Sequence, residues 1–180
     1  MNLWQRTKPI RWLVEMLVIT LVAYLILTTF VLRAYEVEQQ SMEPTLYGSE
    51  RLLVDKLTPN FIGYQLGDIV ILQLPADENG IMPTSFIKRI VAVPGDTIEL
   101  RNGQVLRNGE AMSEPYLGAQ ATLPATEVTQ WQLEEDQYLV FGDNRANSVD
   151  SRFFGPLDRD QLLGRVWIRY MPFDKFGLVQ

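Results

Sequence analysis

Residues 86–96 read Phe-Ile-Lys-Arg-Ile-Val-Ala-Val-Pro-Gly-Asp, an apolar run that carries two cations and ends in a turn signal. The composition suits a buried β-strand, because β-branched and aromatic side chains pack well on a pleated surface. The Pro-Gly pair favours a turn directly after the strand. Since side chains alternate between the two faces of a strand, Lys88 shares its face with Phe86 and Ile90. This stretch therefore predicts a strand that carries a lysine among apolar neighbours.

Short apolar runs of the same kind lie on both sides of this strand. Strands are expected at residues 35–39, 51–56, 68–74, 138–141 and 165–170. Two Asn-Gly pairs, Asn102-Gly103 and Asn108-Gly109, separate short alternating stretches and indicate tight hairpins. Residues 113–130 show little periodicity and are expected to form an exposed excursion within one domain. The sequence predicts a mostly β fold, an antiparallel arrangement of short strands.

The N-terminal segment has a different composition. From Trp12 to Leu32 the chain runs 21 residues with Glu15 as its one charge, and a helix of that length just spans a hydrocarbon core of about 30 Å. Three basic residues precede it, so the positive-inside rule keeps the short N-terminus in the cytoplasm. The predicted organisation is a cytoplasmic segment (1–11), a transmembrane helix (12–32) and an extracytoplasmic β domain (33–180). The alternative is a cleaved signal peptide, although no Ala-x-Ala-like site follows.

Composition excludes several classes of site. The 180 residues contain neither histidine nor cysteine, which excludes disulfides and the Ser-His-Asp arrangement and argues against zinc. Residues 33–180 hold 13 Lys and Arg against 21 Asp and Glu, and this acidic balance argues against nucleic acid as a partner. No phosphate loop, dinucleotide fingerprint or metal-spaced carboxylate cluster occurs. We expect no cofactor and no metal.

A serine follows the apolar segment closely, in the stretch Gln40-Ser41-Met42-Glu43-Pro44-Thr45-Leu46. The proline fixes its own φ and favours an extended residue before it, so the serine is expected on a stiff turn. A serine hydroxyl is a weak nucleophile until a base takes its proton. In a chain without histidine, that base must be a lysine, the N-terminal amine or a carboxylate.

Lys88 is the candidate base because its strand neighbours are apolar. Burial would lower its pKa by up to about 3–5 units, and a neutral amine can accept the serine proton near neutral pH. The alternative is a strand lysine that points to solvent. The loop at residues 142–152 is dense in polar side chains, which would brace a site through Asp–Arg pairs and through contact of Ser148 or Ser151 with the lysine nitrogen. Its alternative is an ordinary polar loop with Asx turns.

Three segments together resemble the conserved boxes of bacterial type I signal peptidases. They are Ser41-Met42-x-Pro44-Thr45-Leu46, the run from Lys88 to Asp96, and the loop from Gly142 to Arg152. The resemblance implies a Ser/Lys dyad serine endopeptidase whose antiparallel β catalytic domain is of the signal-peptidase type. Such a hydrolase removes signal peptides from exported preproteins at the outer face of the plasma membrane. We expect a single-pass protein that contacts the lipid bilayer and is a monomer.

The resemblance also implies roles for individual residues. Ser41 matches the nucleophile, Lys88 the general base, and Ser148 the serine that orients the lysine amine. The ion pairs that brace the site match Asp143, Arg89, Asp150 and Arg152. The family's shallow pockets accept small residues at positions −1 and −3 before the cut, and the matching residues here are Tyr35, Val37, Met42, Leu46, Leu52, Ser85 and Ile87. The substrate is expected to bind as an added strand.

One position departs from the family pattern. Relatives carry a serine two positions before the nucleophile, where its hydroxyl adds to the oxyanion hole, and this chain has Gln39 there. The amide of Gln39 is an adequate donor, although its side chain is longer, and one such donor is worth about 2.7–4 kcal/mol.

Two other functions fit parts of the sequence. A self-cleaving Ser/Lys repressor-type peptidase shares the chemistry, but such proteins carry a DNA-binding domain and no membrane span. A membrane-anchored β domain that docks exported chains without cutting them would make Ser41 and Lys88 ordinary structural residues.

Overall fold

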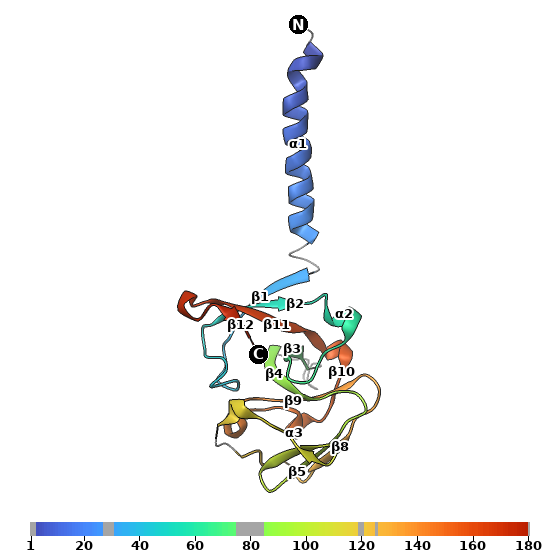
Figure 1. Cartoon of the computed structure of the whole chain (residues 1–180), viewed down its shortest axis with the longest axis vertical. Coiled ribbons are helices and arrows are strands. Elements are labelled where there is room, and N and C mark those ends of the chain that lie inside the picture. Colours follow the sequence, from blue (N-terminus) through green and yellow to red (C-terminus); the bar gives the residue numbers. More distant parts are fainter. Residues whose placement is uncertain (1–2, 27–30, 75–84, 119–120, 125, 180) are drawn as a thin grey trace, which may run out of the picture.

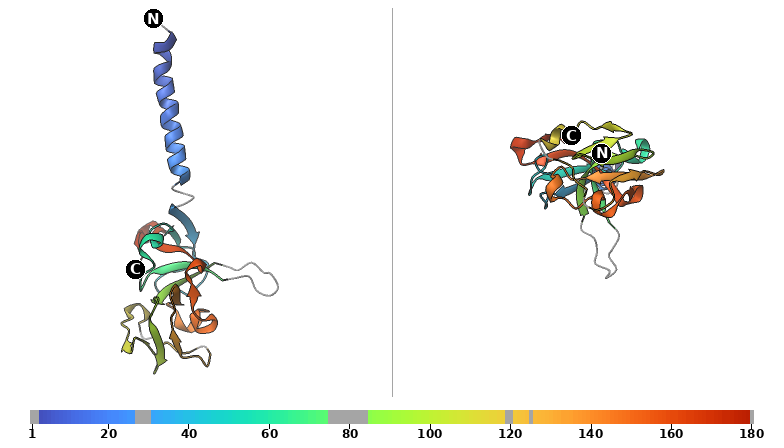
Figure 2. Two further views of the ribbon diagram at one scale, coloured as in Figure 1. Left: turned by 90° about the vertical axis from the view of Figure 1, so that its right-hand side faces the viewer. Right: turned by 90° about the horizontal axis from the view of Figure 1, so that it is seen from below.

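A long helix precedes a body built of β-strands, and Figures 1 and 2 show it leading away from that body. The computed structural model describes residues 3–26, 31–74, 85–118, 121–124 and 126–179. Helix α1 runs over Leu3–Ile26, and its large apolar side chains from Trp12 to Leu25 are exposed. None of the helices in these ranges is both long enough and apolar enough to cross a membrane.

The limits of the N-terminal helix differ from the predicted 12–32. The helix begins nine residues earlier, at Leu3, and Leu32 is already the first residue of strand β1. Residues 27–30 of the predicted span lie outside the described residues. The difference at Leu32 has a physical reason: residues 32–36 find a complete antiparallel partner in strand β2, from Leu32 opposite Asp55 to Glu36 opposite Arg51.

The larger sheet of the described chain has eight strands in the order β1-β2-β11-β3-β4-β9-β10, with β12 paired to β11. Every pairing in it is antiparallel. The strands are β1 (Leu32–Glu36), β2 (Arg51–Asp55), β3 (Ile69–Gln73), β4 (Ser85–Ala92), β9 (Gln137–Phe141), β10 (Leu157–Asp158), β11 (Leu162–Met171) and β12 (Gly177–Leu178). The prediction of a mostly β, antiparallel fold is confirmed.

A smaller sheet lies at the end of the body furthest from α1 (Figure 1). In the order β7-β6-β5-β8, it contains β5 (Thr97–Arg101), β6 (Gln104–Arg107), β7 (Glu110–Ala111) and β8 (Gln130–Gln132). Asn102-Gly103 and Asn108-Gly109 form its two tight turns with positive φ at all four residues, the conformation for which Asn-Gly is favoured. Both predicted hairpins are confirmed.

Short helices complete the described chain: α2 (Pro59–Ile62), η2 (Pro115–Leu117), η3 (Arg145–Asn147), α3 (Ser151–Phe154), η4 (Arg159–Gln161) and η5 (Phe173–Lys175). The excursion at 113–130 is less exposed than expected, because Leu117 and Thr122 are buried. The backbone N–H of Thr122 donates to Gly103 O at 2.8 Å, which ties this segment to the β5–β6 turn. Residues 119, 120 and 125 of the excursion lie outside the described residues.

Strand β4 lies inside the larger sheet, between β3 and β9, where a strand was predicted for residues 86–93. Its pairing with β3 runs from Ser85 to Arg89, with Lys88 opposite Val70 and Arg89 opposite Ile69, whereas its pairing with β9 begins at Arg89. Its first four residues therefore lack a β9 partner on that side. Apolar clusters cover both faces of the strand, which leaves Lys88 and Arg89 buried on opposite faces.

Candidate active site

Ser41 lies on the turn between β1 and β2, and its neighbours fix that turn. Met42 and Leu46 are buried in the core beneath it, and the N–H of Leu46 donates to Met42 O at 2.9 Å. The carbonyl of Ser41 accepts a hydrogen bond from the N–H of Asn144 at 3.0 Å. The turn is therefore anchored both to the core and to the polar loop at 142–152.

Lys88 reaches this turn from the middle of β4. Its Nζ donates to Ser41 Oγ at 2.7 Å and to the carbonyl of Ile87 at 3.0 Å. The lysine is 1% exposed and the serine 7%, so Lys88 is not the solvent-facing strand lysine of the alternative. Burial lowers the pKa of Lys88 to about 8, although the carboxylates of Asp150 and Asp143 oppose this by raising it. A sizeable fraction of the amine is therefore neutral near pH 7–8.

Two buried ion pairs lie near the Ser41–Lys88 contact. Arg89 donates to both carboxylate oxygens of Asp143, at 2.9 and 2.7 Å. Arg152 does the same to Asp150, at 2.8 Å to each oxygen. Bidentate pairs of this kind fix orientation as well as charge. The hydroxyl of Thr45 also donates to Asp143, which joins the serine turn to the first pair.

Gly142 lies where the loop passes closest to the serine turn. A Cβ at this position would lie 2.2 Å from Ser148 Oγ and 2.5 Å from the carbonyl oxygen of Ser41, so no larger residue fits without movement. Its N–H donates to Asp150 Oδ2 at 3.0 Å. Ser148 is buried here, but its Oγ has no hydrogen-bond partner among the described residues, and the expected contact with the lysine is not formed. Ser151, the other serine considered, instead accepts from Val140 N at 3.0 Å.

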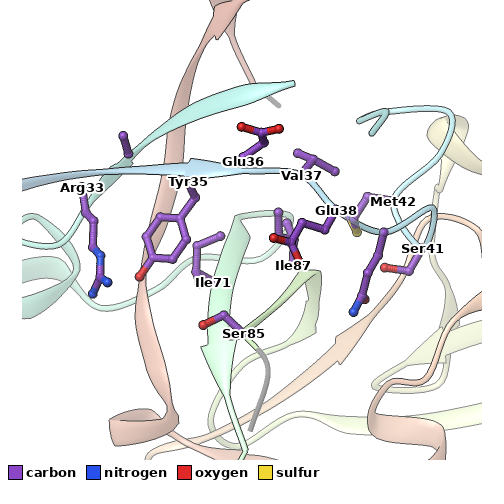
Figure 3. A pocket seen from close by; sticks show the side chains of 12 residues that line it. Arg33, Tyr35, Glu36, Val37, Glu38, Ser41, Met42, Ile71, Ser85 and Ile87 are labelled. Carbon is purple, nitrogen blue, oxygen red and sulfur yellow. The ribbon is translucent and has the colours of Figure 1, made fainter. Parts of the chain in front are cut away.

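A groove of about 320 Å³ runs along β1 and the segment after it, opposite the start of β4. Figure 3 shows Ser41 at one end of this groove and Arg33 at the other. Five of the seven predicted pocket residues line it: Tyr35, Val37, Met42, Ser85 and Ile87. Leu46 and Leu52 do not, because they lie fully buried in the core below. Ile71 lines the groove and was missed.

Gln39 is exposed and lines the groove close to Ser41. An exposed amide has room to turn toward a bound carbonyl group.

A third ion pair near the site was not predicted. Arg145 donates to the carboxylate of Glu114 at 2.6 Å, and its Nε donates to Gly142 O at 3.0 Å. Arg145 also contacts the hydroxyl of Thr122. Arg145 belongs to the polar loop at 142–152, which the sequence analysis singled out. No pattern in the residues around Glu114 indicates its role, because that role depends on how the excursion at 113–130 packs against the loop. Over the described ranges, no cluster of Asp and Glu is placed to hold a metal ion.

The chain is similar to known proteins over most of its length. A family model described as "Signal peptidase, peptidase S26" matches residues 10–171. A probable signal peptidase I-2 of Synechocystis sp. is 39% identical over 153 residues, which cover 84% of this chain and 68% of the relative. A signal peptidase I of Leptolyngbya laminosa is 35% identical over 155 residues (83% and 73%), and a signal peptidase IB of Staphylococcus aureus is 30% identical over 186 residues (95% and 94%).

Among solved structures, a crystal structure of a signal peptidase I from Enterococcus faecalis V583 matches with a TM-score of 0.46 and 29% identity. The match covers 57% of this chain and 95% of that chain.

Proposed function

The chain belongs to the peptidase S26 family of signal peptidases, and on that premise we propose that Ser41 and Lys88 form the catalytic dyad with which it removes signal peptides from exported preproteins. The observation that carries this proposal is the 2.7 Å hydrogen bond between Lys88 Nζ and Ser41 Oγ in a buried setting that lowers the pKa of the lysine. A nucleophile within hydrogen-bond reach of a base whose pKa lies near the working pH is what acyl transfer requires.

The proposed reaction has two steps. Neutral Lys88 takes the proton from Ser41 Oγ, and the oxygen bonds to the scissile carbonyl carbon. Lys88 then gives that proton to the leaving nitrogen as the C–N bond breaks, which leaves an acyl group on Ser41. Water, deprotonated by Lys88, attacks this ester. Lys88 then returns the proton to Ser41 Oγ as the ester C–O bond breaks, which releases the signal peptide with a free carboxylate and restores both side chains. Asp143, Arg89, Asp150 and Arg152 hold the surrounding loops in place.

The groove supports a proposal for substrate selection. β1 is an edge strand, and the first residues of β4 lack a partner on the β9 side, so both can pair with an extended peptide. Small residues at positions −1 and −3 would fit against Val37, Met42 and Ile87. Apolar pockets discriminate by only about 1–3 kcal/mol per methylene-sized change, so rejection of large side chains depends on steric exclusion.

The decisive experiment is incubation of the purified full chain in detergent with a preprotein, followed by identification of the N-terminus of the product. We expect one cut, directly after a small residue at −1 and with a second small residue at −3. An intact preprotein would favour the non-catalytic docking function, and cleavage of the chain itself instead would favour the self-cleaving class.

The pH dependence of kcat/KM should report the pKa of Lys88. Because only the neutral amine can accept the serine proton, the rate should rise with pH and level off above the Lys88 pKa of about 8. A stopped assay from pH 6 to 10 on one preprotein measures this. A rate that keeps rising up to pH 10 would mean that the base has the pKa of an ordinary lysine, about 10.4, and would contradict the proposed role.

Gln39→Ala tests the oxyanion hole. We propose that the Gln39 amide and the N–H of Ser41 both donate to the developing oxyanion. Loss of the amide should then lower kcat by about 10²-fold with little change in KM, because the contact exists only in the transition state. Gln130→Ala, an exposed glutamine on β8 in the smaller sheet, is the matched control. An unchanged kcat in Gln39→Ala would assign the hole to backbone donors alone.

We also propose that the apolar segment beginning at Trp12, of which the described α1 covers only a part, anchors the chain in the plasma membrane as a single pass, with residues 1–11 in the cytoplasm and the β domain outside, as a monomer. The support is the row of exposed apolar side chains, such as Leu17, Ile19 and Leu21, whose exposure to water costs about 25 cal/mol per Å². Wild-type chain should remain with membranes after an alkaline wash, whereas Leu17→Glu combined with Leu21→Glu should be released. Release of both proteins would contradict the anchor.

A further inference from the structure

A second hollow, of about 510 Å³, meets the groove at Ser41. Gln39 and Ser41 line both depressions, and the second is lined in addition by Phe86, Ser148, Val149 and Phe153. We propose that this hollow, here called the leaving-side hollow, binds the first residues after the scissile bond and favours uncharged, apolar side chains there. The proposal rests on the Ser41–Lys88 function.

The position of the two depressions supports this assignment. A peptide whose scissile carbonyl lies at Ser41 Oγ has its acyl side in the groove between β1 and β4. The chain that follows the carbonyl must continue past Ser41, and the leaving-side hollow opens there. A substrate that fills both would cross Ser41 in an extended conformation.

The path of the proton agrees with this direction. The proton that Lys88 receives from Ser41 must pass to the leaving nitrogen, so that nitrogen has to lie on a side that Nζ can reach. The Nζ atom lies 5.4 Å from the ring centroid of Phe86, and Phe86 lines the leaving-side hollow. The base is therefore adjacent to the depression that would contain the departing amine.

The residues that line the leaving-side hollow indicate which substrate side chains it would bind. Of the described residues that line the hollow, none carries a charge, whereas Arg33, Glu36 and Glu38 line the groove. Val149 and Phe153 are 55% and 53% exposed, so they offer apolar surface that a bound side chain can cover. A charged side chain would lose hydration there without gaining a partner.

The test compares two substrates with the same residues before the cut. One continues with four residues that include apolar side chains at the first two positions, and the other is a methyl ester that ends at the cut. In Phe153→Ala, the ratio of kcat/KM for the peptide to kcat/KM for the ester should fall about 10-fold. Phe173→Ala is the matched control, because Phe173 is 79% exposed and lines neither depression, and its ratio should match wild type.

A change of specificity gives a second, independent measurement. A glutamate at the second position after the cut should slow wild-type cleavage, and Val149→Lys should restore it by about 5-fold relative to the apolar peptide. Equal losses on the peptide and the ester in Phe153→Ala, or no restoration by Val149→Lys, would overturn the leaving-side hollow. If wild type cleaved neither substrate, the proposed dyad itself would be wrong, which is a distinguishable result.

Discussion

Precursor cleavage should be lost in Ser41→Ala and should fall by about 10²–10⁴-fold in kcat in Lys88→Met. The first variant removes the atom that would bond to the scissile carbonyl. The second retains an unbranched side chain of similar length in the buried position but removes the nitrogen that accepts the proton, and general base catalysis typically contributes that factor. Timed digestion of a preprotein in detergent, with product quantified on gels, measures both.

Both variants should remain folded, so that their loss of activity can be assigned to the missing catalytic group and not to misfolding. Lys88→Met removes an amine whose charge is disfavoured by burial, so its thermal midpoint should equal or exceed that of wild type. Lys56→Met, at a lysine just after β2 and outside the groove, serves as a control and should retain full activity. Wild-type rates in either dyad variant would end the proposal.

Gly142→Ala should reduce kcat by about 10²-fold or more, although it adds a single methyl group. The new Cβ would lie 2.2 Å from Ser148 Oγ and 2.5 Å from the Ser41 carbonyl oxygen, so the loop and the serine turn must move apart. A displacement of about 1 Å at a reacting group can cost 10²-fold in rate. We also expect a loss of about 1–3 kcal/mol in the free energy of unfolding, as is usual for overpacking.

The matched control for this prediction is Gly48→Ala. A Cβ at Gly48 meets nothing within 4 Å and its backbone needs no positive φ, so both rate and stability should remain near wild type. Kinetics on one preprotein and chemical denaturation of the same samples make the comparison. Full activity in Gly142→Ala would show that the loop tolerates displacement and does not position Ser41.

The two buried carboxylates explain why the site needs its arginines. Asp143 and Asp150 each raise the pKa of Lys88, in opposition to burial. Each is held by a bidentate arginine, which directs much of its negative charge away from the lysine. The arrangement provides hydrogen-bond acceptors that order the loops without holding the lysine in its charged form.

Local pattern was sufficient for the parts of the fold that depend on neighbouring residues. The alternation within residues 86–93 placed Lys88 on an apolar face, and the Asn-Gly pairs predicted the β5–β6 and β6–β7 turns. These signals are reliable because a few neighbouring residues determine to which face each strand side chain points and which conformation a tight turn adopts. The family resemblance named Asp143 and Arg89 among the residues of bracing ion pairs, and in the structure these two pair with each other across 54 positions.

Sequence reasoning failed where distant segments meet. Leu46 and Leu52 were assigned to the pocket but lie in the core, because a match of positions to a family does not reveal which side chains face the groove. Glu114 was missed because its partner Arg145 lies 31 positions away. The end of the N-terminal helix was misplaced because apolar composition continues to Leu32, whereas pairing with β2 determines where the strand begins.

The adjacency of Lys88 and Arg89 has a consequence for how this protein can fail. A slip of β4 by one residue against β3 would exchange the two cations, since successive side chains face opposite sides. A guanidinium, which does not deprotonate in proteins, would then lie beside Ser41. Such molecules would keep their strand content and their compactness but would be unable to cut. The fraction of a preparation that reacts with an active-site titrant should then fall below the fraction that is folded by circular dichroism.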